Sequence, residues 1–121
     1  MYTMGHKSHH TLALDDLVTH LQKIDEYPDN IEWIMREGIW IPHRNTSYSV
    51  FPDLIIVYKD KHAIPVELKS AGYSGSHHLE QLRAGRDFIL SQLQLDCDYG
   101  KISRYDTRKP YLVNEFKTIQ W

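Results

Sequence analysis

Two short apolar runs near the middle of the chain predict a β-hairpin. Residues 54–58 and 63–68 are apolar and rich in β-branched side chains, and four polar residues, 59–62, separate them. A polar segment of this length suits a hairpin connection. Because side chains alternate between the two faces of a strand, Glu67 and Lys69 are expected to point to the same face.

The hydrophobic pattern on either side of the hairpin predicts helices and further strands. Apolar residues recur at helical spacing both before and after it, and alternating runs follow near the end of the chain. The expected helices are 12–24 capped by Thr11, 29–37 after Pro28, and 77–93 capped by Ser76, and the expected strands are 39–41, 99–105 and 111–116. This order of elements predicts an α/β fold with a mixed β-sheet flanked by helices.

Length and composition are typical of a small globular domain. The chain has 121 residues, of which 41% are hydrophobic and 25% charged, so we expect one domain over residues 1–121 with a flexible tail over residues 1–10. The single cysteine, Cys97, excludes an intramolecular disulfide, and the scattered histidines do not form a zinc-binding pattern. No segment resembles a signal peptide or a membrane span, so a cytoplasmic location is expected.

The expected hairpin register brings two acidic residues together. If the turn is centred on Asp60, Asp53 lies opposite Glu67, with β-carbons roughly 5 Å apart. Two carboxylates at this separation repel each other, and a divalent cation between them would remove the repulsion. Hard oxygen ligands of this kind suit Mg²⁺. Lys69 shares a face with Glu67, where it is placed to contact an attacking water or the charge that develops on a phosphate.

Pro52-Asp53, followed on the next strand by Glu67-Leu68-Lys69, resembles the motif of the PD-(D/E)xK nuclease superfamily. The resemblance covers the middle half of the chain. It implies a restriction-endonuclease-like core that cleaves phosphodiester bonds with Mg²⁺, for which Mn²⁺ can substitute. It also implies that Asp53 and Glu67 hold the metal, that Leu68 offers a backbone carbonyl, and that Lys69 assists the attacking water. The same residues also fit an ordinary hairpin with a solvated face of Glu67 and Lys69.

The resemblance suggests two further site residues. Many nucleases of this superfamily carry an additional acid on the helix before the strands, for which Glu32 is the candidate and Glu26 the rival. The helix that follows the catalytic strand in RecB-like and VRR-NUC nucleases is similar to the segment HHLEQLRAGRDFI, in which Gln81 would face the active site. The RecB-like pattern continues with a tyrosine four residues later, where this chain has Gly85, and this departure argues against a RecB-like exonuclease.

Candidate nucleic-acid contacts come from one loop and one helix. Arg44 and Ser47 belong to a polar loop, residues 43–49, that approaches the active site in junction resolvases and VRR-NUC proteins. His77 and Arg83 lie on the helix that would follow the catalytic strand. The net charge of −2 gives no bulk support for nucleic-acid binding, so these contacts depend on local clusters of basic residues.

These observations predict a Mg²⁺-dependent endonuclease that cleaves DNA selectively at branched structures, similar to a Holliday junction resolvase, and acts as a homodimer. A duplex endonuclease of the restriction or repair type and a RecB-like exonuclease are alternatives on the same fold. A nucleic-acid-binding subunit that keeps the fold without turnover is an alternative of a different class.

Overall fold

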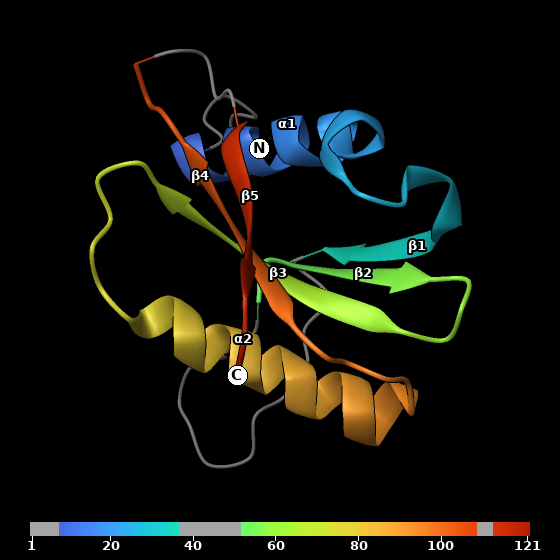
Figure 1. Ribbon diagram of the computed structural model, residues 1–121. Helices are drawn as coiled ribbons and strands as arrows, with labels where there is room; N and C mark the ends of the chain where they lie inside the picture. The colour runs from blue at the N-terminus through green and yellow to red at the C-terminus, as the bar shows by residue number, and fades with distance from the viewer. Residues whose placement is uncertain (1–7, 37–51, 109–112) are drawn as a thin grey trace, which may run out of the picture.

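The computed structural model describes residues 8–36, 52–108 and 113–121, which form an α/β fold with a five-stranded mixed sheet and two helices. The two helices cover opposite faces of the sheet (Figure 1). In chain order the elements are α1 (His9–Ile24), the short 3₁₀-helix η1 (Pro28–Asn30), β1 (Ile31–Arg36), β2 (Leu54–Tyr58), β3 (Ala63–Ser70), α2 (His77–Phe88), the π-helix η2 (Ile89–Leu93), β4 (Gly100–Tyr105) and β5 (Val113–Ile119). The predicted α/β class is confirmed. Of the described helices, none has the length and apolar character that crossing a membrane requires.

The strands lie in the order β1-β2-β3-β4-β5. The first three form an antiparallel meander, and α2 then carries the chain over one face so that β4 pairs parallel with β3. β5 pairs antiparallel with β4. The predicted hairpin register is confirmed, because Leu54 pairs with Val66 and Ile56 pairs with Ile64. The pairing of β3 with β2 ends at Val66, whereas β3 itself runs on to Ser70, so the last residues of β3 are not paired with β2.

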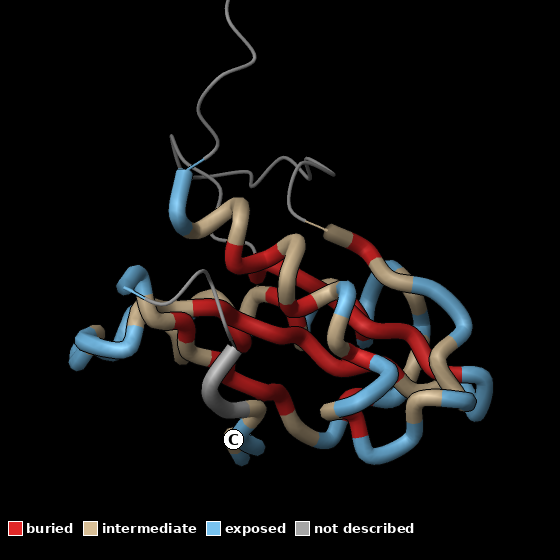
Figure 2. Tube along the Cα trace, turned by 90° about the horizontal axis from the view of Figure 1, so that it is seen from above, coloured by how far each residue is buried: buried red, intermediate tan, exposed pale blue. Residues whose placement is uncertain are grey.

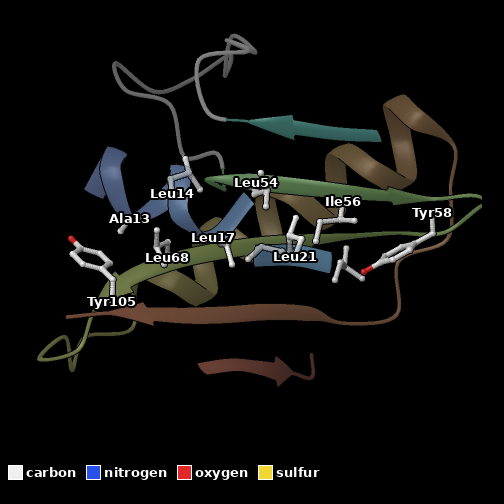
Figure 3. Close-up of a cluster of buried hydrophobic side chains, with 11 residues drawn as sticks. Ala13, Leu14, Leu17, Leu21, Leu54, Ile56, Tyr58, Leu68 and Tyr105 are labelled. Atoms are coloured by element: carbon white, nitrogen blue, oxygen red, sulfur yellow. The ribbon is translucent and has the colours of Figure 1, made fainter. Parts of the chain in front are cut away.

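Alternate side chains of the central strands pack into two apolar layers. The layer between α1 and the sheet, much of which is labelled in Figure 3, contains Ala13, Leu14, Leu17 and Leu21 of α1 and Leu54, Ile56, Tyr58, Ile64, Val66, Leu68 and Tyr105 of the strands. The layer on the opposite face contains Met35, Ile55, Val57, Ala63, Ile89 and Cys97. Because both faces are covered, the central strands are buried while the hairpin turn is exposed (Figure 2). Each fully buried Leu or Ile contributes about 1.5–3 kcal/mol relative to an exposed one.

Helix α1 begins earlier than predicted. Its N-cap is Ser8 and not Thr11, and the backbone N–H of Thr11 donates to Ser8 Oγ at 3.1 Å. Serine and threonine are both good N-caps, so the pattern alone did not distinguish them. The predicted tail over residues 1–10 is therefore too long, because His9 and His10 belong to the first turn of the helix.

The predicted helix over residues 29–37 is wrong. A single 3₁₀ turn, η1, is followed directly by the strand β1, which pairs antiparallel with β2. A short apolar run fits either a helix or a strand. The strand is formed here because β2 has an edge whose backbone groups require hydrogen-bond partners, and β1 supplies them.

The predicted helix over residues 77–93 is confirmed as α2 followed by η2. Ser76 occupies the N-cap position, although its side chain makes no capping hydrogen bond. The predicted strand over residues 99–105 corresponds to β4, and that over residues 111–116 corresponds to β5, displaced toward the C-terminus. The predicted strand over residues 39–41 lies outside the described residues.

Candidate active site

An acidic pair, Asp53 and Glu67, lies where β2 begins and β3 runs on beyond it. Both side chains are buried, with 6% of Asp53 and 1% of Glu67 exposed. The backbone N–H of Asp53 donates to Glu67 Oε1 at 3.0 Å. The structure therefore brings together the two carboxyl groups that the hairpin register predicted to be neighbours.

The end of β2 explains how Asp53 is held. Leu68 lies beyond the last residue of β3 that pairs with β2. Its backbone N–H donates to Asp53 Oδ2 at 2.8 Å. The carboxylate thus takes the place of the backbone carbonyl that a longer β2 would have supplied. In a strand, the N–H and C=O of one residue point to the same side. The Leu68 carbonyl therefore faces the edge at which Asp53 lies, which is compatible with its predicted role toward a metal.

Lys69 lies beside the acidic pair because it follows Glu67 by two residues along β3, so the two side chains share one face of the sheet. Its Nζ lies 3.1 Å from Glu67 Oε2, and the side chain is 21% exposed. The ammonium group also lies 5.0 Å from the centre of the Tyr73 ring. Lys69 is thus at the boundary between the buried acids and solvent, where it can reach a substrate group without leaving the site.

The two acids differ in how firmly they hold a proton. Burial, and then the negative charge of Asp53, raise the pKa of Glu67 to about 8, although Lys69 acts in the opposite direction. Burial also acts to raise the pKa of Asp53, but hydrogen bonds from His10, Glu67 and the Leu68 N–H outweigh it and hold that pKa below its ordinary value. The pair therefore shares one proton near neutral pH, mainly on Glu67. A divalent cation would displace this proton, because it favours both ionised carboxylates.

His10 is a site residue that the sequence analysis missed. Because α1 begins at His9, the ring of His10 lies beside the sheet, with Nε2 3.1 Å from Asp53 Oδ2. The ring also contacts Tyr105 of β4 edge-on, with ring centroids 6.2 Å apart. The N-cap serine at position 8 was the signal that could have placed His10 in a helix rather than in a tail.

The donor atoms at the acidic pair fit Mg²⁺ in kind. Asp53 and Glu67 supply carboxylate oxygens, and the Leu68 carbonyl faces the same edge. Within residues 8–36, 52–108 and 113–121, no group of three or more His, Cys, Asp or Glu side chains is arranged to hold a metal ion. A cation that needs many protein ligands is therefore poorly served here, whereas Mg²⁺ commonly uses one or two carboxylates together with waters and substrate phosphates.

Gln81 lies on the half-buried flank of α2, and its predicted role stays a prediction. Its Oε1 is buried and has no hydrogen-bond partner among the described residues. Buried acceptors are normally satisfied by protein or ordered water. This oxygen is accordingly suited to bind a water molecule or a substrate donor.

Neither of the two candidate upstream acids is among the contacts that the described residues make with the acidic pair. Glu32 is exposed on β1, four residues before Arg36, whose partner is Leu54, so it is roughly 13 Å along the strand from that end of the sheet. Glu26 accepts from Lys101 Nζ at 3.0 Å. Glu32 does not join Asp53 and Glu67 because it lies on a strand and not on the expected helix, and the Glu26 carboxylate is paired with Lys101 instead.

Of the four predicted nucleic-acid contacts, the two on α2, His77 and Arg83, are not among the residues that contact the acidic pair. The His77 side chain is 82% exposed, with Nδ1 4.0 Å from Glu80 Oε2. Arg83 is exposed on α2, next to the buried Leu82. Arg44 and Ser47 lie outside the described residues.

Helix α2 approaches both the residue before Asp53 and the strand β3 closely because residue 85 is glycine. A β-carbon at position 85 would lie 2.7 Å from both Pro52 Cγ and Pro65 Cβ. The departure of Gly85 from the RecB-like tyrosine therefore has a steric reason. The same contact fixes Pro52, and with it the backbone that carries Asp53.

With this geometry established, the chain was compared with protein-family models, with curated proteins and with solved structures, and none of the three comparisons gave a match.

Proposed function

We propose that this protein is a Mg²⁺-dependent nuclease that hydrolyses phosphodiester bonds in DNA. The observation that carries the proposal is the buried Asp53–Glu67 pair with Lys69 3.1 Å from Glu67. A mixed sheet with helices on both faces agrees with what the resemblance to the PD-(D/E)xK superfamily implies, namely a restriction-endonuclease-like core. Both carboxylates of the pair can be ionised together in a buried site only when a cation accompanies them, so the pair is suited to bind a metal ion in place of its shared proton.

The residues of the chain would divide the chemistry among them. Asp53, Glu67 and the Leu68 carbonyl would hold Mg²⁺, which when bound supplies charge stabilisation and an acidified water. Lys69 would orient the attacking water or stabilise the negative charge that grows on the phosphate. The Leu68 N–H and His10 would keep the Asp53 carboxylate in one orientation.

We further propose that the substrate is branched DNA, cleaved by a homodimer in the manner of a Holliday junction resolvase. The described residues contain one sheet and two helices and no separate DNA-recognition module. Recognition of DNA shape is therefore better supported than recognition of a long sequence. The RecB-like alternative is weakened by the contact of Gly85 with two prolines, because no tyrosine fits there.

Cleavage of labelled DNA tests this proposal. The wild type is mixed with Mg²⁺ and a four-way junction, a flap, a linear duplex or a single strand, and Lys69→Met is measured in parallel. Paired nicks in the junction are expected, and Lys69→Met should reduce the rate by about 10²–10³-fold, as for the loss of one preorganised charge-stabilising group. Lys69→Arg, which keeps the charge, and Lys23→Met, on the exposed last turn of α1, are the controls.

Each alternative has its own outcome in this assay. Preferential cleavage of the linear duplex would support the restriction or repair type, and a requirement for free ends would support the exonuclease. Binding of DNA with no cleavage in Mg²⁺ or Mn²⁺ would refute the nuclease and leave a nucleic-acid-binding subunit.

The contact of His10 with Asp53 predicts a role in metal binding. Replacing His10 by alanine is expected to raise the Mg²⁺ concentration needed for half-maximal activity by about 10–100-fold, because the residues that orient a metal ligand have effects of this size. His10→Gln, which can still donate a hydrogen bond, should restore part of the affinity. His20→Gln, the same change on a later turn of α1, should leave the Mg²⁺ dependence as it is in the wild type. An equal loss at saturating Mg²⁺ with an unchanged midpoint would contradict this role.

A further inference from the structure

A group of cationic and aromatic side chains lies beside the acidic pair, on the face of the sheet that α2 covers. Lys69 and Arg104 are partners in the parallel register of β3 and β4, so their side chains leave the sheet on the same face. Pro65, which packs against Gly85 of α2, lies on this face too, because residues 65 and 69 of β3 are separated by an even number of positions.

Tyr73, in the connection between β3 and α2, is the centre of this group. Lys69 Nζ lies 5.0 Å from the centre of its ring, and the ring of His78 contacts it edge-on with centroids 5.7 Å apart. The backbone N–H of His78 donates to Tyr73 Oη at 3.3 Å. We call Lys69, Tyr73, His78 and Arg104 the Tyr73 cluster.

Arg104 fixes the path of the same connection. Its Nη1 donates to the carbonyl oxygens of Tyr73 at 2.7 Å and of Ser70 at 3.3 Å. The guanidinium group therefore lies against the connection instead of extending into solvent. This attachment limits the positions that Arg104 can adopt, so little side-chain entropy remains to be lost when an anion binds.

Lys69 and Arg104 both lie close enough to His78 for their charges to affect its pKa. Burial, and then the positive charges of Lys69 and Arg104, lower the pKa of His78. The imidazole is therefore neutral near pH 7 and keeps one N–H donor, while the two neighbouring cations supply charge. An anion with several acceptor oxygens satisfies such a combination, and phosphate is one of the two anions, with carboxylate, whose geometry the guanidinium group matches.

We propose that Arg104 and His78 bind a second phosphate of the nucleic-acid strand, adjacent to the phosphate that the acidic pair and Lys69 would attack. This inference depends on the proposed nuclease function for the identity of the ligand. Lys69 contacts Glu67 on one side and Tyr73 on the other, so it links the two positions. The strand would run from the acidic pair across the connection between β3 and α2, and Arg104 and His78 would fix its register.

Binding measured without cleavage tests this second phosphate site. The dissociation constant of a labelled DNA duplex and of a labelled four-way junction is measured in EDTA over a range of salt concentrations. Arg104→Gln is expected to weaken binding roughly tenfold and to reduce the slope of log affinity against log salt by about one, as for the loss of one phosphate contact. Arg104→Lys, which keeps the charge, should retain the slope.

Neutral linkages identify the phosphate itself. Single methylphosphonate linkages are moved along the strand, and one position is expected to weaken binding by the wild type. That penalty should disappear in His78→Gln and in Arg104→Gln, because the contact is already lost. His78→Gln decides the question by itself if Arg104→Gln fails to fold. Lys23→Gln, roughly 20 Å along α1 from His10, is the control for a general loss of charge.

Two results would overturn the second phosphate site. One is wild-type affinity and salt slope in both Arg104→Gln and His78→Gln. The other is an equal loss of affinity in Lys23→Gln, which would indicate a diffuse field and not a site. Failure of the proposed nuclease function is seen separately, as the absence of cleavage in Mg²⁺, and it leaves this binding measurement intact.

Discussion

Replacement of Glu67 by glutamine is expected to reduce Mg²⁺-dependent cleavage by at least about a thousandfold and to make the protein more stable at pH 8. The loss of activity follows because the amide cannot supply a negatively charged ligand, and metal coordination contributes several kcal/mol to such reactions. The gain in stability follows because Glu67 is 1% exposed and lies beside Asp53, so its ionised form is unfavourable in the folded protein. A neutral side chain of the same shape avoids that cost, so the free energy of unfolding at pH 8 should rise by about 1–3 kcal/mol.

The pH dependence of stability tests the same argument with a definite sign. The pKa of Glu67 rises from 4.5 to about 8 on folding, so between these values the folded protein binds a proton that the unfolded chain has released. The stability that this proton supplies is complete below about pH 4.5 and is lost as the pH rises to about 8. Urea unfolding of the wild type should show a free energy that falls by at most about 1.4 kcal/mol per pH unit over this range.

Three comparisons make this measurement decisive. Glu67→Gln should flatten the pH profile, whereas Glu80→Gln, the same change at an exposed position of α2, should leave it unchanged. Mg²⁺ should raise the free energy of unfolding of the wild type at pH 8, with an increase that grows with the logarithm of the Mg²⁺ concentration above its dissociation constant. This stabilisation should be lost in Glu67→Gln. A variant that is less stable than the wild type at pH 8, or equally stabilised by Mg²⁺, would contradict the charged pair as a metal site.

Replacement of Gly85 by alanine is expected to destabilise the protein. Alanine in the interior of a helix is ordinarily more favourable than glycine by about 1 kcal/mol. Here the added β-carbon would lie 2.7 Å from Pro52 and from Pro65. Proline rings cannot rotate away, so the helix must move, and we expect a net loss of about 1–3 kcal/mol in the free energy of unfolding. Cleavage should also fall, because Pro52 precedes Asp53.

Thermal and urea unfolding measure this effect, with Gly72→Ala as the matched control. A β-carbon at position 72 meets no atom within 4 Å, so that variant should be as stable as the wild type or slightly more stable. If Gly85→Ala were also as stable as the wild type, the close packing of α2 on the proline before Asp53 would not hold.

The central hairpin could be predicted from the sequence because its determinants are local. Alternation places Glu67 and Lys69 on one face of β3 whatever the rest of the chain does. The polar turn centred on Asp60 then pairs Leu54 with Val66, which puts Asp53 beside Glu67. The acidic pair and its lysine were therefore predictable before any tertiary contact was known.

The partners of the acidic pair could not be predicted in the same way, because they come from distant segments. His10 reaches Asp53 only because α1 begins at His9 and packs on the sheet. Arg104 and His78 meet at Tyr73 through the parallel pairing of β4 with β3 and the crossover of α2. The segment from Ile31 to Arg36 became a strand because the edge of β2 required hydrogen-bond partners. Local pattern thus determined the motif residues and their spacing, and long-range packing decided their electrostatic surroundings.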